Sequence, residues 1–423
     1  MKTLRSQEEL IAQVPETGSL FLHGAAATPL PLVEELLHQS ERFRNLEIIH
    51  LHTSGPGAYA DPAYAGHFRV TNLFVGENMR RRLDYDRVDY LPCFLSEMPA
   101  LFRRGLKRLD VALVQVSPPD SHGFCSLGTS VDAARAAVET AGLVLAQINP
   151  RMPRTHGDGV VPVERIHFAV EITAELPESR CAGADPVEAR IAQQVAGLVE
   201  DGACLQMGIG AIPDAVLAAL KNHRHLGVHT EMFSDGVLDL VERGAIDNSR
   251  KVSHPGKIVG SFVTGTRRLF DFVHDNSAAI LLEAGYVNSV HNIARNPKAV
   301  AINSAVEVDL TGQVCADSVG SRIISGVGGQ MDFIRGATIS EGGKAVIALA
   351  SRTKKGRPRL VAQLQPGAGV VTTRAHVHYV VTEYGVADLY GKTLGERARM
   401  LIGIAHPDDR EALERAWREL IRG

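Results

Sequence analysis

The sequence predicts an α/β fold made of two tandem, related domains with mainly parallel sheets. Three observations support this prediction. The chain has 423 residues, which is too long for one compact core, so two domains are expected. Strand and helix signals alternate along the whole sequence, as is typical of parallel sheets covered by helices. Finally, one strand–turn–helix unit occurs twice, roughly 180 residues apart, as in a duplicated domain.

The repeated unit is an apolar strand, a glycine-containing turn, a proline near the first helical turn and an apolar helix. It occupies residues 19–37 and again residues 204–220. Two further pairs of segments match in the same order: 46–53 with 226–232, and 72–81 with 260–268. A turn-forming segment rich in proline and glycine separates the copies. We therefore predict an N-terminal domain at 1–183 and a C-terminal domain at 184–423.

Composition excludes several classes of protein. Hydrophobic residues make up 45% and charged residues 22% of the chain, and the net charge is −3, so we expect neither nucleic acid nor a membrane as partner. The 5 cysteines lack CxxC or Cys/His spacing, and the first ten residues lack an apolar signal core. No apolar run reaches the roughly 20 residues that span a bilayer. These features predict a cytoplasmic protein with no disulfide framework and no metal site.

The segment around Glu231 carries the clearest sign of chemistry. Residues 228–232 have the pattern of a short strand, and Ser234 is placed to cap the next helix. Glu231 is thus predicted at the C-terminal end of a strand, where open parallel sheets bind ligands. The first half offers Thr53 or Ser54 near this place, so a reactive carboxylate would belong to the second domain. A surface ion pair is the alternative for a lone glutamate.

Two glycine clusters belong to the second domain. The segment Gly-Ile-Gly-Ala-Ile-Pro at 208–213 follows a strand and opens a helix, so its N–H groups could receive an anion. A nicotinamide site is disfavoured because Pro213 occupies the place of the third glycine of GxGxxG. The segment Ser-Gly-Val-Gly-Gly-Gln-Met-Asp at 325–332 has three glycines in four positions. Such a loop allows close approach of a ligand to the backbone.

Other polar residues fit structural roles better. His229 shares a strand face with Glu231 but lies two residues away, beyond hydrogen-bond reach, so we expect a packed histidine. Asp235 suits an early helix position, and Cys125 and Cys204 have the character of buried thiols. The sequence also lacks a Gly-x-Ser-x-Gly elbow. This leaves a lone glutamate, which can act as a nucleophile towards an acyl group with a good leaving group such as a thiolate.

Several segments resemble the acetyl-CoA hydrolase/transferase family, and within it the 4-hydroxybutyrate and butyryl-CoA:acetate CoA-transferases. They are residues 208–213, 229–236, 302–313, 325–332 and 382–389, with 94–99 and 116–128 in the first half. The resemblance implies two tandem CoA-transferase-type domains with the active site between them. It also implies a ping-pong exchange in which Glu231 attacks an acyl-CoA thioester and then carries CoA as a glutamyl thioester. No metal and no tightly bound cofactor are implied, since the CoA thioester is the substrate.

The resemblance also assigns site residues. Glu231 is the catalytic nucleophile, and the N–H of Gly328 or Gly329 together with a side-chain amide would stabilise the oxyanion. Asn288 matches that amide best, and Asn303 is the alternative. The residues expected along coenzyme A are Gly208, Ile209, Gly210, Ile212, Pro213, Phe262, Gly265 and Gly326. Candidate phosphate contacts are Arg267, Arg268, Lys354 and Lys355, the last two in a hairpin tip.

The sequence therefore predicts a CoA-transferase acting on a short-chain acyl-CoA and a carboxylic acid such as acetate, butyrate or 4-hydroxybutyrate. Two alternatives stay open. An acyl-CoA hydrolase results if water reaches the glutamyl-CoA, and a non-catalytic CoA-ester-binding protein results if the fold only holds the ligand. A homo-oligomer, most simply a two-fold dimer, is expected.

Overall fold

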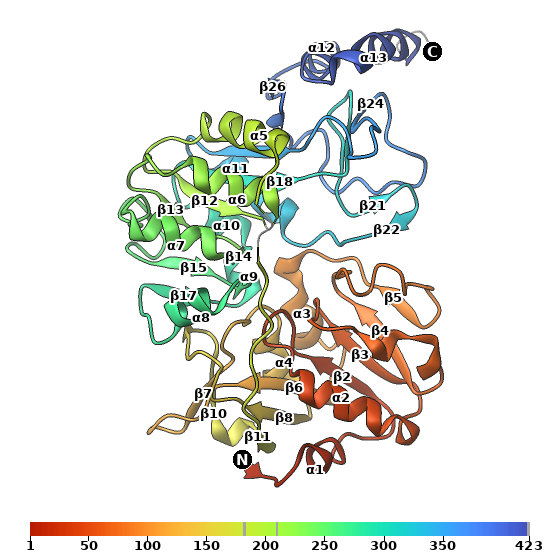
Figure 1. Ribbon diagram of the computed structural model, residues 1–423, viewed down its shortest axis with the longest axis vertical. Helices are drawn as coiled ribbons and strands as arrows, with labels where there is room; N and C mark the ends of the chain where they lie inside the picture. Colours follow the sequence, from red (N-terminus) through yellow and green to blue (C-terminus); the bar gives the residue numbers. More distant parts are fainter. Residues whose placement is uncertain (181–182, 209, 421–423) are drawn as a thin grey trace. The chain divides into compact units, whose positions relative to one another are not determined.

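The computed structural model describes residues 1–180, 183–208 and 210–420. Within this part, the chain forms two compact units (Figure 1). The first unit comprises Met1–Arg180 and Val259–Val287, and the second takes the remaining described residues, 183–258 and 288–420. The domain boundary at 183/184 stays a prediction. The structure adds that a later segment, 259–287, belongs with the first unit.

The first unit is built on an eight-stranded parallel sheet. Its central strands are buried along their whole length, because helices cover both faces of a parallel sheet. In spatial order the strands are β1 (Lys2–Thr3), β11 (Phe168–Glu171), β8 (Leu143–Ile148), β6 (Val111–Val116), β2 (Ser19–Leu22), β3 (Leu46–His50), β4 (Phe68–Asn72) and β5 (Val88–Tyr90).

The helices of the first unit are short. They are α1 (Gln7–Ile11), α2 (Leu30–His38), α3 (Met98–Arg103), α4 (Ala134–Thr140), α8 (Arg267–Val273) and α9 (Ala284–Val287). Helix α2 is the helix predicted after the first glycine turn, and it has a proline in its first turn, where the missing N–H costs nothing.

The second unit is built on a six-stranded sheet that is parallel except for its last pair. In spatial order the strands are β13 (Gly227–Val228), β12 (Cys204–Met207), β18 (Ala299–Ser304), β23 (Lys344–Ala348), β25 (Tyr379–Thr382) and β26 (Gly385–Asp388). The helices are α5 (Pro186–Ala196), α6 (Ala211–Ala219), α7 (Asp235–Glu242), α10 (Val290–Ala294), α11 (Gln330–Ile339), α12 (Leu394–Gly403) and α13 (Pro407–Leu420). Helices α5 and α11 lie against this sheet (Figure 1).

The two sheets share a strand order, which confirms the predicted pair of related α/β units. The order β3-β2-β6-β8-β11 in the first sheet matches β13-β12-β18-β23-β25 in the second. The pairing registers match as well, since Ser19 lies opposite Glu47 and Cys204 lies opposite Gly227. In both units the first central strand is followed by a helix, α2 or α6, as the repeated sequence pattern predicts.

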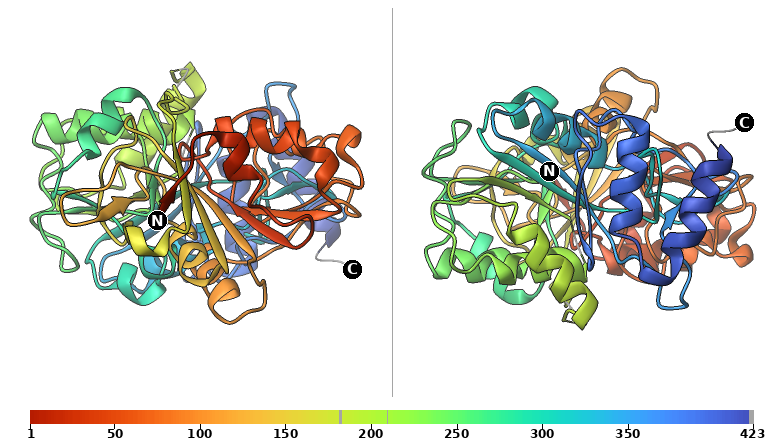
Figure 2. Two further views of the ribbon diagram at one scale, coloured as in Figure 1. Left: turned by 90° about the horizontal axis from the view of Figure 1, so that it is seen from below. Right: turned by 90° about the horizontal axis from the view of Figure 1, so that it is seen from above.

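Short strands and two final helices complete the units. The short strands are β7 (Phe124–Ser126), β9 (His156–Gly157), β10 (Val160–Pro162), β14 (Met232–Phe233), β15 (Ile258–Gly260), β16 (Phe262–Val263), β17 (Ala279–Leu281), β19 (Glu307–Asp309), β20 (Val314–Cys315), β21 (Ser318–Val319), β22 (Arg322–Ile323) and β24 (Leu360–Val361). Helices α12 and α13 pack side by side, as the dark blue ribbons of Figure 2 show.

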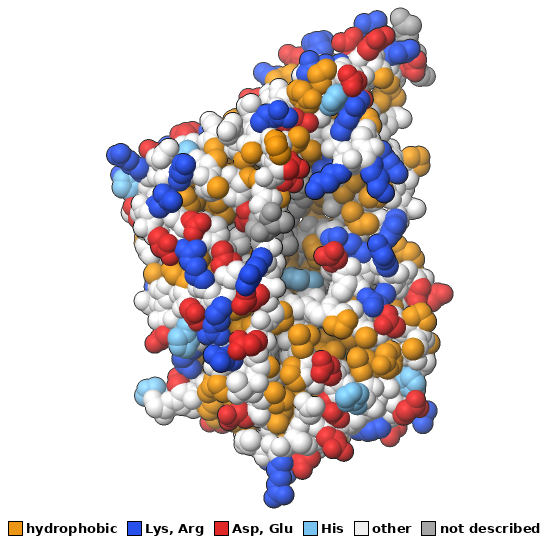
Figure 3. Space-filling model, viewed as in Figure 1, with side chains coloured by type: hydrophobic (Ala, Val, Ile, Leu, Met, Phe, Trp, Pro, Cys, Tyr) orange, Lys and Arg blue, Asp and Glu red, His pale blue; other side chains and the backbone are white. Residues whose placement is uncertain are grey.

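The surface carries charge of both signs. Figure 3 shows Lys and Arg side chains interspersed with Asp and Glu over the face that it draws, in keeping with a net charge of −3. On this face, charges of the two signs alternate rather than forming an extended field of one sign. Among the described residues, no helix is both long and apolar enough to cross a bilayer.

Candidate functional site

Glu231 lies in a bend that directly follows the sheet. Strand β13 ends at Val228 and β14 begins at Met232, so the predicted single strand over 228–232 is wrong. The reason is Thr230, which is fully buried. Its hydroxyl accepts from the N–H of Met207 at 3.2 Å and lies 2.9 Å from the carbonyl of Met232, so a side chain replaces the backbone ladder here. Glu231 lies three residues beyond the end of β13 rather than at the end of a strand, and the two-residue strand β14 separates it from α7.

Helix α7 begins just after this bend, but not with the predicted cap. Ser234 occupies the N-cap position, yet its hydroxyl donates to Asp214 Oδ1 at 3.0 Å and makes no bond to the helix N–H groups. The predicted serine cap is therefore wrong, because a neighbouring carboxylate is the stronger acceptor. Asp235 lies in the first turn of α7, as predicted, where the helix dipole favours negative charge.

Asn288 is the amide that reaches Glu231. It directly follows α9, is fully buried, and its Nδ2 lies 3.2 Å from Glu231 Oε2. The amide of Asn303, the other candidate, instead donates to Gln206 Oε1 at 3.0 Å. The structure therefore brings together Glu231 and Asn288, which are 57 positions apart in the chain.

A glycine loop presses against the same carboxylate. A Cβ atom on Gly329 would lie 1.9 Å from Glu231 Oε2 and 2.2 Å from Asn288 Nδ2, distances that no side chain permits. Gly328 has a φ of 56°, in the left-handed region that glycine adopts without strain, and Gly326 is buried beside them. The structure thus places the predicted glycine loop directly against Glu231. The catalytic roles of these residues stay predictions.

Asp332 is the site residue that sequence reasoning missed. It is the third residue of α11, is 5% exposed, and its Oδ2 lies 3.3 Å from Asn288 Nδ2. The available signal was its position, because it closes the glycine-rich motif at the start of a helix. Asn288 thus donates to two carboxylates at once.

The first half of the expected coenzyme A site lies between β12 and α6. Gly210 precedes α6 with a φ of 118°, and no described atom lies within 4 Å of where its Cβ would be. Ile212 and Pro213 stand in the first turn of α6, Gly208 directly follows β12, and Ile209 lies outside the described residues. The N–H groups at the start of this nine-residue helix suit an anion, but the binding role stays a prediction.

Of the other expected coenzyme A residues, Gly326 belongs to the second unit, and Phe262 and Gly265 belong to the first. Phe262, in β16, is buried with its ring centre 5.3 Å from that of His52. The carbonyl of Gly265 accepts a hydrogen bond from the N–H of Ser179 at 2.9 Å. These contacts give both residues a local packing role, and their contact with coenzyme A stays a prediction.

The candidate phosphate contacts are surface side chains. Arg267 donates to Asp271 at 2.8 Å, and Arg268 is exposed. Lys354 and Lys355 are exposed in a tight turn, which a bridge between Arg352 and Pro358 closes as predicted. The strand after this turn, β24, pairs with β19 rather than with β23, so the hairpin is confined to the turn.

The residues given structural roles behave as predicted. His229 is 3% exposed and packs edge-on against Phe333, with ring centres 6.3 Å apart. Cys125 and Cys204 are buried, and burial raises the pKa of each thiol to about 11, which keeps both in the unreactive protonated form. Among the described residues, no three His, Cys, Asp or Glu side chains cluster as metal ligands would.

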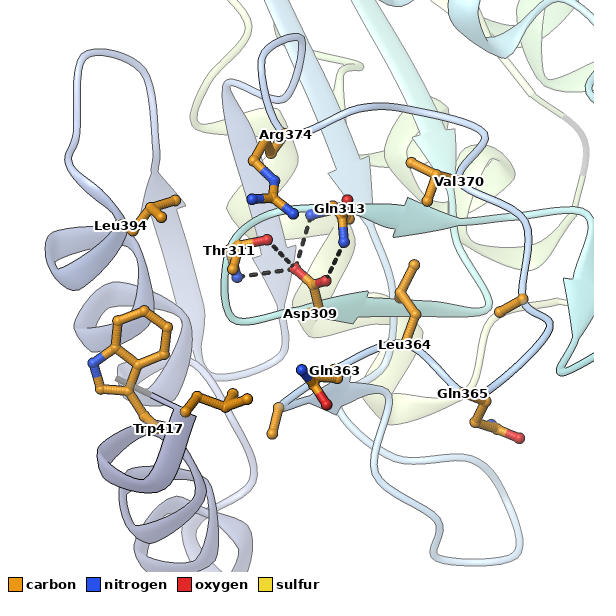
Figure 4. A pocket seen from close by; sticks show the side chains of 13 residues that line it. Asp309, Thr311, Gln313, Gln363, Leu364, Gln365, Val370, Arg374, Leu394 and Trp417 are labelled. Carbon is orange, nitrogen blue, oxygen red and sulfur yellow. Dashed lines mark hydrogen bonds between the residues drawn. The ribbon is translucent and has the colours of Figure 1, made fainter. Parts of the chain in front are cut away.

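A separate groove of about 580 Å³ lies in the second unit (Figure 4). Trp417 and Leu394 line one side, and Leu364 and Val370 line the other. The carboxylate of Asp309, within the groove, is held by its own loop neighbours. None of the predicted site residues lines this groove, so its size does not make it the site of chemistry.

Fold and site together define an α/β protein with a carboxylate at a sheet edge, paired with a buried carboxamide and a glycine loop. This combination suits nucleophilic acyl chemistry, in which a carboxylate attacks and nearby donors stabilise an oxyanion. Family models agree with this class. Residues 1–179 match the acetyl-CoA hydrolase/transferase N-terminal domain, and residues 265–417 match the C-terminal domain of the same name.

Characterised relatives are similar over nearly the whole chain. A succinyl-CoA:acetate/propanoyl-CoA:succinate CoA transferase from Fasciola hepatica is 51% identical, covering 97% of this chain and 86% of the relative. A 4-hydroxybutyrate coenzyme A transferase from Clostridium kluyveri is 47% identical, covering 97% and 96%. The crystal structure of a 4-hydroxybutyrate CoA-transferase from Porphyromonas gingivalis superposes with a TM-score of 0.85 at 37% identity, covering 99% and 98%. The chain belongs to the acetyl-CoA hydrolase/transferase family and, like these relatives, is an enzyme.

Proposed function

We propose that this enzyme is a CoA-transferase that moves CoA from a short-chain acyl-CoA to a carboxylic acid, with Glu231 as the nucleophile. The acids we propose are of the acetate, butyrate or 4-hydroxybutyrate type. One observation carries the proposal: Glu231 Oε2 lies 3.2 Å from the amide nitrogen of Asn288 and against Gly329, where a Cβ would meet it at 1.9 Å. The relatives, which transfer CoA between small acids, support the same class of substrate.

In the first half-reaction a carboxylate oxygen of Glu231 attacks the acyl carbonyl carbon of the thioester. A C–O bond forms, the C–S bond breaks, and CoA leaves as a thiolate, giving an acyl-glutamyl anhydride. The thiolate then attacks Cδ of Glu231. The anhydride C–O bond breaks, the acyl group leaves as a carboxylate, and CoA stays on the enzyme as a glutamyl thioester. An incoming carboxylate reverses both steps and departs as the new acyl-CoA.

We propose that Asn288 stabilises the oxyanion that forms when the thiolate attacks Cδ of Glu231. If Oε1 is the atom that becomes acylated, Oε2 remains as the carbonyl oxygen of the anhydride and later of the thioester. Attack at Cδ turns that oxygen into an oxyanion, and Asn288 Nδ2 already lies 3.2 Å from Oε2. A preorganised donor of this kind is typically worth about 3 to 4 kcal/mol of barrier. The N–H of Gly328 or Gly329 is proposed as the second donor.

The parts of coenzyme A far from the thioester would contribute binding energy that positions the reacting atoms. We propose that its tail contacts the start of α6, around Gly208 and Gly210. Contacts remote from the reacting atoms can hold the thioester against Glu231 and so lower the barrier. Gly210 leaves open space beside the helix N-terminus, which favours the approach of a ligand chain.

The direct test is intact mass of the enzyme after incubation with acetyl-CoA or butyryl-CoA, followed by borohydride reduction and peptide mapping of residues 226–250. A CoA adduct on Glu231 that disappears when acetate is added, with transfer of the acyl group, is the expected result. No adduct together with steady, acetate-independent acid release would favour the hydrolase. Bound CoA ester with neither adduct nor turnover would favour the non-catalytic binder.

We also infer a cytoplasmic homo-oligomer, most simply a two-fold dimer. The unpatterned cysteines favour a reducing compartment, and closed two-fold dimers are the commonest assembly of soluble proteins. Light scattering coupled to size-exclusion chromatography should give a mass of at least twice 45.6 kDa. A monomer at micromolar concentration would overturn this part of the proposal.

A further inference from the structure

We propose that Asp332 is a positioning residue that keeps the NH₂ group of Asn288 turned towards Glu231 throughout the reaction. The inference rests on the proposed function, because it assigns a role in the exchange carried out at Glu231. Asp332 does not touch the reacting atoms in this assignment. It acts through the carboxamide of Asn288.

The geometry places Asn288 between two carboxylates. Its Nδ2 lies 3.2 Å from Glu231 Oε2 and 3.3 Å from Asp332 Oδ2, so each of its two N–H bonds has an acceptor. Asn288 is fully buried and Asp332 is 5% exposed, so water does not compete freely for these bonds. The other end of the carboxamide, Oδ1, is buried with no hydrogen-bond partner among the described residues.

The unpartnered Oδ1 indicates that the hydrogen bonds of the NH₂ group determine the orientation of the Asn288 carboxamide. A carboxamide can rotate by half a turn and exchange its oxygen and nitrogen at little steric cost. An ionised carboxylate accepts hydrogen bonds and cannot donate them. Rotation of Asn288 would therefore lose two charge-assisted bonds and place its oxygen against two anions. The two carboxylates outweigh the cost of leaving Oδ1 without a partner.

Asp332 matters most when Glu231 has lost its charge. In the anhydride and in the glutamyl thioester, Glu231 is acylated or thioesterified and neutral, so its hold on the amide weakens. Those are the stages at which Asn288 must donate to the developing oxyanion. Asp332 takes no part in the bond changes, so its carboxylate stays in place as the acceptor that prevents rotation.

The start of α11 suits a carboxylate. Asp332 is the third residue of this ten-residue helix and follows the loop that ends with Gly329. The partial positive charge at a helix N-terminus stabilises an anion in the first turn. The helix that carries Asp332 therefore continues directly from the glycine loop that lies against Glu231.

A double-mutant cycle tests the assignment. We expect N288A to lower kcat by about 100-fold, as loss of one oxyanion donor does. D332A should cost roughly as much, with little change in the KM for acyl-CoA, because the rotated amide no longer donates. In the N288A background, D332A should change kcat less than about twofold, since there is no amide left to orient. D332N, which keeps the shape and an acceptor without the charge, should cost about tenfold.

Controls separate positioning from folding and from the proposed function. E396Q removes a carboxylate from the same third position of α12, where it caps the helix, and should leave kcat unchanged. If D332A does not fold, D332N replaces it in the double-mutant cycle with N288A. Independent, multiplicative losses in the double mutant would overturn the positioning role. If the wild-type enzyme forms no CoA adduct on Glu231, the proposed function itself is wrong. If the adduct forms but the losses in the double mutant multiply, only the role of Asp332 is rejected.

Discussion

The corresponding strand ends of the two sheets differ in the residues that come directly after them. In the first unit, His23 follows β2 and His50 ends β3, and both imidazoles are fully buried. In the second unit, Gly208 follows β12 and Glu231 lies beyond β13, half-buried beside a glycine loop. Both edges are built by the same strand order. The shared strand order therefore gives both sheets the same row of carboxyl strand ends, and the residues that follow each strand determine which side chains lie there.

Matching registers show which residue the first unit has at the position equivalent to Glu231. Glu47 and Gly227 occupy corresponding pairs, so counting forward places Leu51 where the second unit has Glu231. The sequence pattern alone places Thr53 or Ser54 near this point. Leu51 is 3% exposed, and the hydroxyl of Thr53 lies 2.8 Å from that of Tyr59. In the first unit an apolar side chain, Leu51, thus occupies the position equivalent to Glu231, and the nearby hydroxyl of Thr53 is hydrogen-bonded to Tyr59.

The strongest test of this contrast removes the carboxylate itself. E231Q keeps the shape of the side chain but not its nucleophilicity, and should lower kcat by at least about 10⁴-fold without preventing folding. E242Q, at the end of α7, is the matched control and should retain activity. Activity is measured as acetate-dependent CoA transfer, and adduct formation is followed by intact mass. Near-normal turnover of E231Q would show that Glu231 is not the nucleophile.

The glycine loop is the next point to test. In G329A the added Cβ would overlap Glu231 Oε2, at 1.9 Å, and Asn288 Nδ2, at 2.2 Å. The carboxylate and the amide must separate, and we expect kcat to fall by about 100-fold or more. G403A, in α12, meets no described atom within 4 Å and should be neutral or slightly stabilising. Equal activity of both variants would show that the close approach does not matter for turnover.

Sequence patterns captured the elements that depend on local chemistry. The alternation of strands and helices and the repeat follow from residue periodicity and turn residues, and both are confirmed. Contacts between distant segments were out of reach. Whether Asn288 or Asn303 meets Glu231 depends on the packing of α10, which follows Asn288, against α11. The bridge from Asn288 to Asp332, and the Thr230 hydroxyl that ends β13, likewise require the fold to be known.

Acid should affect β3 of the first unit before β12 of the second. Buried histidines with lowered pKa values end or follow strands of the first sheet, whereas no histidine lies in β12 or directly beside it in the sequence. Burial lowers the pKa of His50 to about 3, and neighbouring His52 lowers it further in the same direction. Burial also lowers the pKa of His23 and of His52, with Asp132 opposing the shift in each case. A lowered pKa means that the unfolded state takes up protons first as the pH falls below about 6.5, so stability is lost on acidification.

For His50 alone this loss amounts to about 3 kcal/mol by pH 4.5, and it grows until the pH approaches the folded-state value. Hydrogen exchange measured at pH 7 and pH 4.5 should show earlier loss of protection in β3 than in β12. The variant H50Q, which cannot be protonated, should reduce the difference between the two pH values. Equal loss of protection in both sheets would contradict the role assigned to these histidines.

The second unit has a pH response in the alkaline range through one buried lysine. Lys251 is 5% exposed, and its Nζ donates to the carbonyls of Val228 at 2.7 Å and Lys257 at 2.5 Å, with burial lowering its pKa to about 8. The unfolded value is about 10.5, so the unfolded state binds more protons between these values. Folding is therefore penalised below pH 8, and the penalty is relieved as the pH rises towards 10.5. Relief of about 2 kcal/mol is expected between pH 8 and 9.5.

Denaturant unfolding of wild type and K251M at pH 8 and pH 9.5 measures this relief as a difference between the two proteins. K251M loses two hydrogen bonds at both pH values, so only the change with pH reports the titration. Because Lys251 holds the carbonyl of Val228, three residues before Glu231, its proton also connects the stability of β13 to the geometry of the site. If both proteins respond equally to pH, Lys251 does not titrate in this range. The two units would then differ only in their response to acid.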